Sequence, residues 1–378
     1  MKIAINAVAL ASAGGLSVGL NFLRQIRNND LDLSKVIVFV PAGCNYEQFR
    51  SELIEIIVVP NLFRKHFFRL FTDFIWLPYK IKKTKPDVIF SMGNFGTPIK
   101  NIPQAILFHW AYAVYPESPE IWNRMTSSER LKRKTRVNVF KNRLKYANVV
   151  FPQTHTIASR LTKYYPESPS VVVIPNAYSQ IEKKSTSSKN YFNKEQNRRY
   201  LLCLSHYYTH KNLDILIEVA HYLKIHRLNV SIILTISKGY SDLSDELLEK
   251  IESNQLSPYI FSVGQVTIED VSTVYGEVDA LILPTLLESF SGTYVDAMHF
   301  EKTIFTSDRD FAREVCGEAA YYFDPLSAED IIRTIEKAFA NPEERQMKIE
   351  AGKQRVQTFP DWKAVAQMYL TELKKLHE

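Results

Sequence analysis

Two acidic residues in the second half of the chain, Glu288 and Asp296, are placed for ligand chemistry. A predicted strand at 280–283 precedes them, and its carboxyl end delivers Glu288 to the edge where open α/β sheets bind ligands. Residues 289–293 begin a predicted helix, whose free amides and positive dipole end favour a phosphate. Asp296 falls about one turn inside this helix, so both carboxylates can face one small ligand. On pattern alone, a pair of solvated cap and first-turn acids is the alternative.

A second polar turn follows a predicted strand earlier in the same half. The sequence LLCLSHYYTHKNLDILI, residues 201–217, predicts a strand, a turn and a helix. Its turn carries His210 and Lys211, an imidazole and a point charge that can donate hydrogen bonds to a diphosphate. An ordinary exposed lysine in the first helical turn is the alternative. His206 lies four residues before His210, but no third ligand is nearby in the sequence, so no metal site is predicted.

Three loops of the first half also follow predicted strands. Gly14 and Gly15 would let a backbone approach a phosphate or a sugar, or would simply form a tight turn. Asn94, between glycines, can hydrogen-bond an acceptor or serve as a turn residue. His109 ends a strand and is a candidate for contact with a substrate. Its alternative is a histidine packed among aromatic residues such as Tyr112.

The elements that must hold these residues alternate along the whole chain. Short β-branched runs are each followed by a helical pattern, which predicts βαβ units and two doubly wound α/β halves. A polar stretch at 179–198 is expected to be a linker or surface loop between them. We therefore expect domains at 1–178 and 199–357, and a closing helix at 358–378 that crosses back to the first domain. The predicted strands are 3–8, 36–40, 56–59, 88–91, 105–108, 149–151, 171–174, 200–204, 231–236, 260–263, 280–283, 304–306 and 321–323.

Length and composition exclude several classes of protein. With 378 residues, 46% of them hydrophobic and 23% charged, the chain is folded and longer than one core usually grows. Glycine is scarce, and neither GxGxxG nor GxxxxGK[ST] occurs, which disfavours dinucleotide enzymes and P-loop NTPases. Three scattered cysteines fit a reducing compartment. The sequence shows no signal peptide pattern and no run of 18 uncharged apolar residues. We expect a cytoplasmic protein, or one peripheral on the inner face of the cell membrane.

The charge is distributed unevenly. Residues 1–178 hold 24 Lys or Arg against 11 Asp or Glu (+13), and residues 179–378 hold 23 against 30 (−7). Two basic segments, Arg64–Lys85 and Arg130–Lys145, interleave cations with aromatic or apolar residues. Such segments are typical of helices on an anionic membrane, and equally of amphipathic helices with solvated basic faces. No nucleic-acid reader motif accompanies them, so no nucleic-acid partner is expected.

Taken together, the two polar turns resemble motifs of the retaining GT-B glycosyltransferases of family 4. Glu288 to Asp296 resembles the Glu-x7-Glu element of that family, and His210-Lys211-Asn212 resembles its phosphate-binding turn. Gly14-Gly15, the VIPNA sequence ending at residue 177 and the FPDW sequence ending at residue 362 extend the resemblance over nearly the whole chain. In two places the chain departs from the pattern. An aspartate stands at 296 where the family usually has glutamate, and a histidine stands where it usually has arginine, at 210 or, in an alternative register, at 206.

The resemblance implies a fold of two Rossmann-like domains facing across a cleft, and transfer of a hexose or deoxyhexose from a nucleotide-diphosphate sugar to a glycan or lipid-linked acceptor. It implies no metal and no cofactor beyond the donor substrate. His109, Lys211 and Glu288 are the implied catalytic residues. The implied acceptor-binding residues are Gly14, Asn94 and Tyr112. The implied donor-binding residues are Gly15, His206, His210, Lys211, Glu288, Ser289, Phe290, Ser291, Gly292, Thr293 and Asp296.

The pathway expected from this resemblance is bacterial surface polysaccharide synthesis. Two other functions use the same kind of nucleotide-sugar site. One is a GT-B sugar-nucleotide epimerase or hydrolase, which turns over the donor alone. The other is a catalytically silent protein that binds a nucleotide sugar without turnover.

Overall fold

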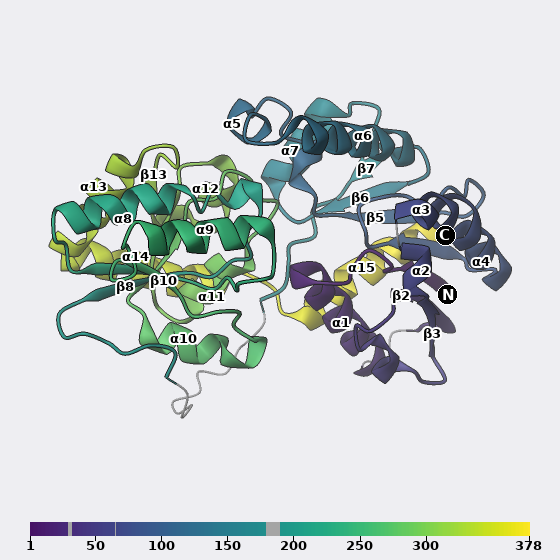
Figure 1. Cartoon of the computed structure of the whole chain (residues 1–378). Coiled ribbons are helices and arrows are strands. Elements are labelled where there is room, and N and C mark those ends of the chain that lie inside the picture. The colour runs from purple at the N-terminus through teal and green to yellow at the C-terminus, as the bar shows by residue number, and fades with distance from the viewer. Residues whose placement is uncertain (29–31, 65, 179–189) are drawn as a thin grey trace. The chain divides into compact units, whose positions relative to one another are not determined.

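A computed structural model describes the chain at residues 1–28, 32–64, 66–178 and 190–378. Two parallel β-sheets, each flanked by helices, form the framework (Figure 1). Within these described ranges, thirteen strands lie at the thirteen predicted positions, within a few residues at each end. The α/β prediction is therefore confirmed, with one sheet in each half of the chain.

The sheet of the first half has seven strands in the order β3-β2-β1-β4-β5-β6-β7, paired in parallel. The strand order reverses between β1 and β4, which makes this the switch point of a doubly wound sheet. The loops after β1, β4 and β5 leave the same edge. The strands are β1 Lys2–Asn6, β2 Lys35–Pro41, β3 Ile54–Val59, β4 Val88–Ser91, β5 Gln104–Phe108, β6 Val149–Pro152 and β7 Ser170–Val171.

Helices cover both faces of this sheet. On one face α1 and the final helix α15 share a core with the strands, including Phe22, Phe90 and Tyr369. On the other face Leu77 and Ile81 of α4 pack in a second cluster with strand residues. The helices of this unit are α1 Ala13–Asn28, η1 Tyr46–Phe49, α2 Asn61–Arg64, α3 His66–Phe71, the π-helix η2 Thr72–Trp76, α4 Leu77–Thr84, η3 Ala111–Ala113, α6 Ser127–Leu144, α7 His155–Tyr164 and α15 Trp362–His377.

The closing helix α15 begins where the sequence pattern places it. The Asp361 side chain caps it by accepting from the Ala364 N–H at 2.7 Å. Its apolar side chains, among them Trp362 and Leu373, lie in the core of the seven-stranded sheet, and α15 lies beside α1 (Figure 1). Residues far apart in sequence therefore share one core.

The sheet of the second half has six strands in the order β10-β9-β8-β11-β12-β13, again parallel. Its order reverses between β8 and β11. The strands are β8 Arg199–Cys203, β9 Val230–Leu234, β10 Ile260–Ser262, β11 Ala280–Leu283, β12 Thr303–Ser307 and β13 Ala320–Phe323. The helices are α5 Pro119–Trp122, η4 Thr209–Lys211, α8 Ile215–Ile225, α9 Asp242–Ser253, η5 Ile268–Asp270, α10 Val271–Glu277, α11 Gly292–His299, α12 Asp310–Cys316, η6 Gly317–Ala319, α13 Ala328–Ala340 and α14 Pro342–Val356.

The chain divides into two compact units. Unit 1 contains residues 1–116, 127–177 and 360–378, and unit 2 contains residues 117–126 and 178–359. One part of this division differs from the expected domains, because residues 117–126 group with unit 2 although they interrupt the first half. An ion pair between Arg309 and Glu120, at 3.7 Å, is one contact of these residues with the rest of unit 2.

The expected linker at 179–198 lies in part outside the described residues, since only 190–198 are described. This described part has neither helix nor strand. It is held to unit 2, because Phe192 packs on Tyr200 and Phe261 and the Tyr191 amide donates to Glu277.

Candidate functional site

The two polar turns of unit 2 meet. Strands β8 and β11 are neighbours in the sheet, so the segments that follow them leave its edge side by side. Lys211 follows β8 and Glu288 follows β11, and the lysine ammonium forms an ion pair with Glu288 Oε1. Both side chains are mostly buried, with 17% and 11% exposed. The lysine and the acid predicted from two separate motifs thus lie in direct contact.

Hydrogen bonds hold these two segments in register. The Leu286 amide donates to the His210 carbonyl at 2.8 Å, and the Thr285 hydroxyl donates to the same carbonyl at 3.2 Å. Asn212 is buried, has a φ of 57°, and donates from its side-chain amide to the carbonyls of Pro284 and Pro325 at 3.1 and 2.7 Å. Asparagine tolerates the left-handed conformation better than most residues. In the sequence Asn212 stood out only as part of a motif, although an asparagine that ends a polar turn is a signal for this clamping role.

Helix α11 begins directly after Glu288. Ser291 is its N-cap residue and is buried together with Ser289, while Gly292 is the first helical residue. A Cβ placed on Gly292 would meet no atom within 4 Å, so there is open space at the start of the helix. The first-turn amides of a helix have no intrahelical acceptor and favour an anion. An open helix start therefore follows, four residues along the chain, the carboxylate that holds the Lys211 cation, and this combination suits a phosphate group.

The other predicted donor-binding residues of this segment lie around the helix start. Phe290 is half-buried and packs edge-on against Phe359, with ring centroids 6.0 Å apart. Thr293 is half-buried, and its carbonyl accepts from the Tyr275 hydroxyl at 3.2 Å. These contacts fix the segment that carries Glu288 from two sides.

Aromatic rings flank the histidines of the first turn. His206 stacks on Tyr240 with centroids 5.1 Å apart, and His210 stacks on Tyr208 with centroids 5.8 Å apart. Burial, with a smaller contribution from Lys211, lowers the pKa of His206. A neutral imidazole at position 206 is therefore favoured at neutral pH. Tyr240 comes from the loop after β9, and no motif in the sequence pointed to it.

Asp296 lies one turn into α11, near Tyr178 and Tyr275. Burial raises the pKa of its carboxyl to about 7. Its charge contributes to raising the pKa of Tyr178, which is about 12 and is shifted mainly by burial. The Tyr178 hydroxyl is hydrogen-bonded to His299 Nδ1, one turn further along the same helix. The sequence pattern predicted Asp296 beside a ligand but gave no sign of its neighbours Tyr178 and Tyr275, because nothing local in the sequence reports burial.

The raised pKa of Asp296 predicts a pH-dependent cost in stability. Since the folded-state pKa lies above the ordinary value of 3.8, folding is opposed increasingly as the pH rises from about 4 to about 7. Replacing Asp296 with asparagine removes this cost. We expect Asp296→Asn to raise the melting temperature relative to the original protein by roughly 2–4 °C at about pH 8, and by less at about pH 5.

Asp308 provides a control of opposite sign. A hydrogen bond from Arg313 lowers the pKa of its carboxyl, so its charged form stabilises the fold above the ordinary aspartate pKa. Asp308→Asn is therefore expected to lower, not raise, the melting temperature at about pH 8. If Asp296→Asn lowers the melting temperature at both pH values, burial does not disfavour the ionised form of the Asp296 carboxyl.

The predicted residues of unit 1 gather at its switch point. His109 follows β5 and Asn94 follows β4, and the Asn94 Oδ1 accepts from the His109 backbone amide at 2.7 Å. The Asn94 side-chain nitrogen lies 3.2 Å from His109 Nε2. Asn94 has a φ of 71°, as its predicted turn role requires, and is buried. Its side chain therefore serves to orient His109 rather than only to form a turn.

His109 is a neutral imidazole. Burial, together with the charge of Arg136, lowers its pKa to about 4. Because the Asn94 amide donates to Nε2, that nitrogen is the acceptor and the ring proton belongs on Nδ1. A Cβ placed on Gly15 would lie 4.0 Å from the same Nε2, so Gly15 keeps the approach to this ring open.

The remaining predicted residues of unit 1 differ in their surroundings. Gly14 lies in the first turn of α1, and a Cβ there would meet nothing within 4 Å. Tyr112 is buried in η3 with the Arg133 guanidinium 4.0 Å above its ring. Gly15 belongs to unit 1, whereas every other predicted donor-binding residue belongs to unit 2. Within the described residues, no three His, Cys, Asp or Glu side chains form a cluster with metal-binding geometry.

Sequence comparison gives the family. The model described as Glycosyl transferases group 1 matches residues 184–355, and the model described as Glycosyltransferase Family 4 matches residues 31–179. The chain belongs to glycosyltransferase family 4. A sequence search of the curated proteins finds no match.

Solved structures agree on the fold of this glycosyltransferase. Sucrose-phosphate synthase from Thermosynechococcus elongatus has a TM-score of 0.76 at 15% identity, covering 99% of this chain and 98% of that one. WaaG, a glycosyltransferase involved in lipopolysaccharide biosynthesis, has a TM-score of 0.74 at 14% identity, covering 98% and 99%. HepE from Anabaena in complex with UDP-glucose has a TM-score of 0.70 at 15% identity, covering 99% and 100%. The predicted GT-B fold is confirmed.

The family defines the reaction in outline. The protein is a glycosyltransferase that moves a sugar from a nucleotide sugar, in a family whose enzymes retain the anomeric configuration and typically need no metal. No helix in the described ranges combines the length and hydropathy needed to cross a bilayer.

Proposed function

We propose that this glycosyltransferase transfers a hexose or deoxyhexose from a nucleoside-diphosphate sugar to a glycan or lipid-linked acceptor, in the synthesis of a bacterial surface polysaccharide. The observation that carries the proposal is the contact of Lys211 with Glu288 beside the open start of α11. A cation, a carboxylate and free helix amides within one small region are what a sugar pyrophosphate requires.

The leaving group determines what these residues must do. Breaking the glycosyl phosphate bond produces an oxocarbenium-like sugar and a departing diphosphate. Lys211, with His210 and the amides at 291–293, would stabilise the charge that develops on the diphosphate. These donors are fixed by the bonds of Asn212 and Leu286, so little reorganisation is required during the reaction.

Glu288 and His109 would act on the sugar rather than on the phosphate. Glu288 accepts a hydrogen bond from Lys211 and retains acceptor capacity for hydroxyl groups of the donor sugar. His109, neutral and oriented by Asn94, would contact the transferred sugar as a hydrogen-bonding group. No covalent nucleophile is assigned, and the leaving phosphate would take the proton of the acceptor in a same-face attack.

Two of the similar structures support the donor and the pathway. HepE was solved with UDP-glucose, and WaaG is described as an enzyme of lipopolysaccharide biosynthesis. UDP-glucose is therefore the first donor to test, and a glycan acceptor of the cell surface the first acceptor class.

The proposal is tested with a panel of nucleotide sugars, measured by thermal shift and by release of the nucleoside diphosphate with and without acceptor glycans. We expect one donor to stabilise the protein and to be turned over faster with acceptor present. Turnover at the same rate without acceptor would favour an epimerase or hydrolase instead. Stabilisation without any turnover would favour a silent binding protein.

Gly292→Ala tests where the phosphate lies. The open space at this position means that a methyl group does not disturb the fold, so the melting temperature is expected to stay the same or to rise slightly. We expect UDP to bind about tenfold more weakly, because the methyl group occupies the space proposed for the phosphate. Gly276→Ala is the matched control, since that helical glycine also faces open space but lies in α10. Equal UDP affinity in the two variants would place the phosphate elsewhere.

A further inference from the structure

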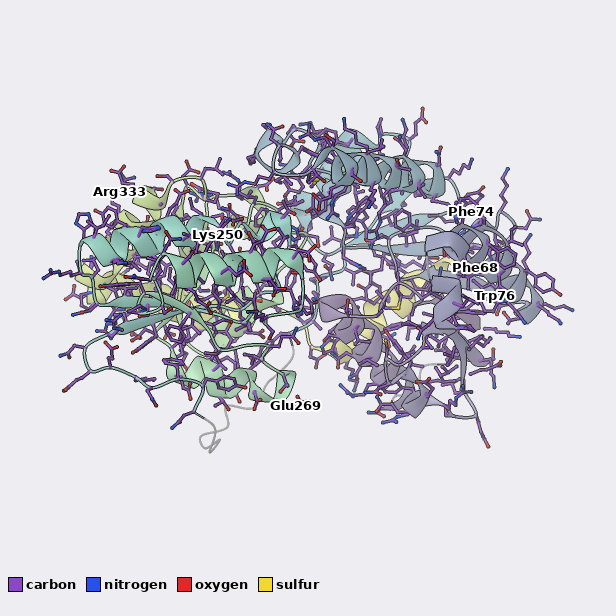
Figure 2. All side chains as sticks on the ribbon, in the orientation of Figure 1. Phe68, Phe74, Trp76, Lys250, Glu269 and Arg333 are labelled. Carbon is purple, nitrogen blue, oxygen red and sulfur yellow. The ribbon has the colours of Figure 1, made fainter. Side chains whose placement is uncertain are left out.

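An apolar stripe lies on the surface of unit 1. It consists of large side chains of α3, η2 and α4 that are between 41% and 67% exposed: Phe68, Leu70, Phe71, Phe74, Ile75 and Tyr79. Figure 2 labels Phe68 and Phe74 on this segment. Elsewhere in the described chain, exposed large apolar side chains such as Ile225 and Met347 stand singly in the sequence. A cluster of this kind marks an interaction site, whereas scattered exposed residues need no explanation.

The spacing of the stripe follows the helix. Phe68, Phe71, Ile75 and Tyr79 are three or four residues apart along α3, the π-helix η2 and α4, and all four side chains are exposed. The opposite face of α4 is used by the fold, because Leu77 and Ile81 are buried against the sheet. The segment is therefore apolar on two faces: Leu77 and Ile81 lie in the core, whereas Ile75 and Tyr79 are 59% and 60% exposed.

The charge around the stripe is strongly positive. Residues 61–85 contain seven Lys or Arg and one acid, Asp73. Lys82, Lys83 and Lys85 are exposed directly beyond the end of the stripe. The Lys80 ammonium lies 5.8 Å from the ring centroid of Trp76. Long lysine side chains beside aromatic and aliphatic ones suit a surface that is apolar inside and anionic at its boundary.

The second basic segment contributes less than its sequence suggests. Arg133 and Arg136 of α6 lie over the rings of Tyr112 and Trp110, at 4.0 and 4.8 Å. Arg143 is buried, stands 3.9 Å above the Phe74 ring, and donates to the Asp73 carbonyl at 3.3 Å. These arginines support aromatic residues of unit 1, so the helical segment that carries the stripe is the better candidate for an external partner.

We propose that the apolar stripe docks this protein on an anionic lipid bilayer, with the helix axis of α3 to α4 in the plane of the interface. The exposed rings and aliphatic chains would enter the boundary of the acyl region, and Lys82, Lys83 and Lys85 would face anionic headgroups. A second copy of the chain is disfavoured as the occupant, because a two-fold contact through this surface would bring together two segments that each hold seven Lys or Arg and one acid. The proposal does not depend on the sugar-transfer reaction, because it can be measured without donor or acceptor.

Vesicle binding of the full chain tests the proposal. We expect flotation with vesicles that contain about one third phosphatidylglycerol in phosphatidylcholine, and much weaker flotation with phosphatidylcholine alone. The double variant Ile75→Gln/Tyr79→Gln is expected to bind the anionic vesicles at least about tenfold more weakly. Its matched control is Ile225→Gln/Met347→Gln, which removes two exposed apolar residues from unit 2 and is expected to bind normally.

Charge reversal separates the electrostatic contribution to vesicle binding from the apolar one. Lys82→Glu/Lys83→Glu is expected to abolish the preference for anionic vesicles, whereas Lys337→Glu/Lys363→Glu, at exposed positions on α13 and α15, is expected to retain it. The proposal fails if the stripe variant floats as well as the original protein. It also fails if the stripe variant changes the oligomeric state by size exclusion while vesicle binding is unaffected, which would identify a protein partner. Donor turnover in solution should be unchanged in all four variants, so failure here leaves the proposed reaction untouched.

Discussion

Replacing Lys211 with alanine is expected to lower kcat/KM for the donor by about 100- to 1000-fold, the usual effect of removing one fixed donor to developing charge. The ammonium is held by an ion pair with Glu288, three residues before the N-cap of α11. UDP binding should also weaken, because part of the interaction is made in the ground state. Steady-state kinetics with the identified donor and UDP titration by calorimetry measure the two effects.

Two further variants show whether the loss of kcat/KM in Lys211→Ala is specific to this lysine. Lys250→Ala removes the lysine of α9 (Figure 2) that forms an exposed ion pair with Asp214, and activity should be unchanged because such pairs contribute little. Lys211→Arg keeps the charge and should recover part of the activity. Wild-type kinetics in a folded Lys211→Ala variant would remove this lysine from the mechanism.

Glu288→Gln is expected to separate turnover from nucleotide binding. The amide keeps the shape of the side chain but cannot hold Lys211 by charge, and it is a weaker acceptor for sugar hydroxyls. We expect kcat to fall about 100-fold. UDP affinity should stay equal or rise, because Lys211 is released from its ion pair and can turn to the diphosphate.

Glu269→Gln is the matched control for this variant. Glu269 is an exposed acid of the same unit (Figure 2), and its replacement should leave kcat and UDP affinity unchanged. A loss of UDP affinity in Glu288→Gln as large as that in Lys211→Ala would mean that Glu288 acts only by positioning the lysine. The double variant Lys211→Ala/Glu288→Gln distinguishes a positioning role of Glu288 from a direct contact with the sugar. If the two residues act through one contact, the effects of the two substitutions on kcat do not add.

Much of the fold is determined by local pattern. Thirteen β-branched runs became thirteen strands because each is short, apolar and bounded by a helical pattern. The apolar spacing at 362–376 predicted a docking helix, and α15 packs in the core of unit 1. The two motifs after β8 and β11 also followed from sequence, because parallel strands present their carboxyl ends at one edge.

Other features depended on contacts that no local pattern records. Residues 117–126 group with unit 2, although they are surrounded in sequence by unit 1. The alignment of β8 beside β11 decides that Lys211 meets Glu288, which are 77 residues apart. Asn94 had the sequence of a turn residue, and only the adjacency of β4 and β5 gave it His109 as a partner.

Burial is the physical reason for this difference. Hydropathy and periodicity act over a few residues, so the sequence by itself determined the elements, their order and the residue types at their ends. The pKa of a side chain, and whether a helix face is buried or exposed, depend on the groups that pack against it. Strands and helices bring these groups from distant parts of the chain. The tertiary structure therefore decided that the carboxyl of Asp296 has a pKa near 7, that His109 is neutral, and that the face of α3 to α4 carrying Ile75 and Tyr79 remains outside the core.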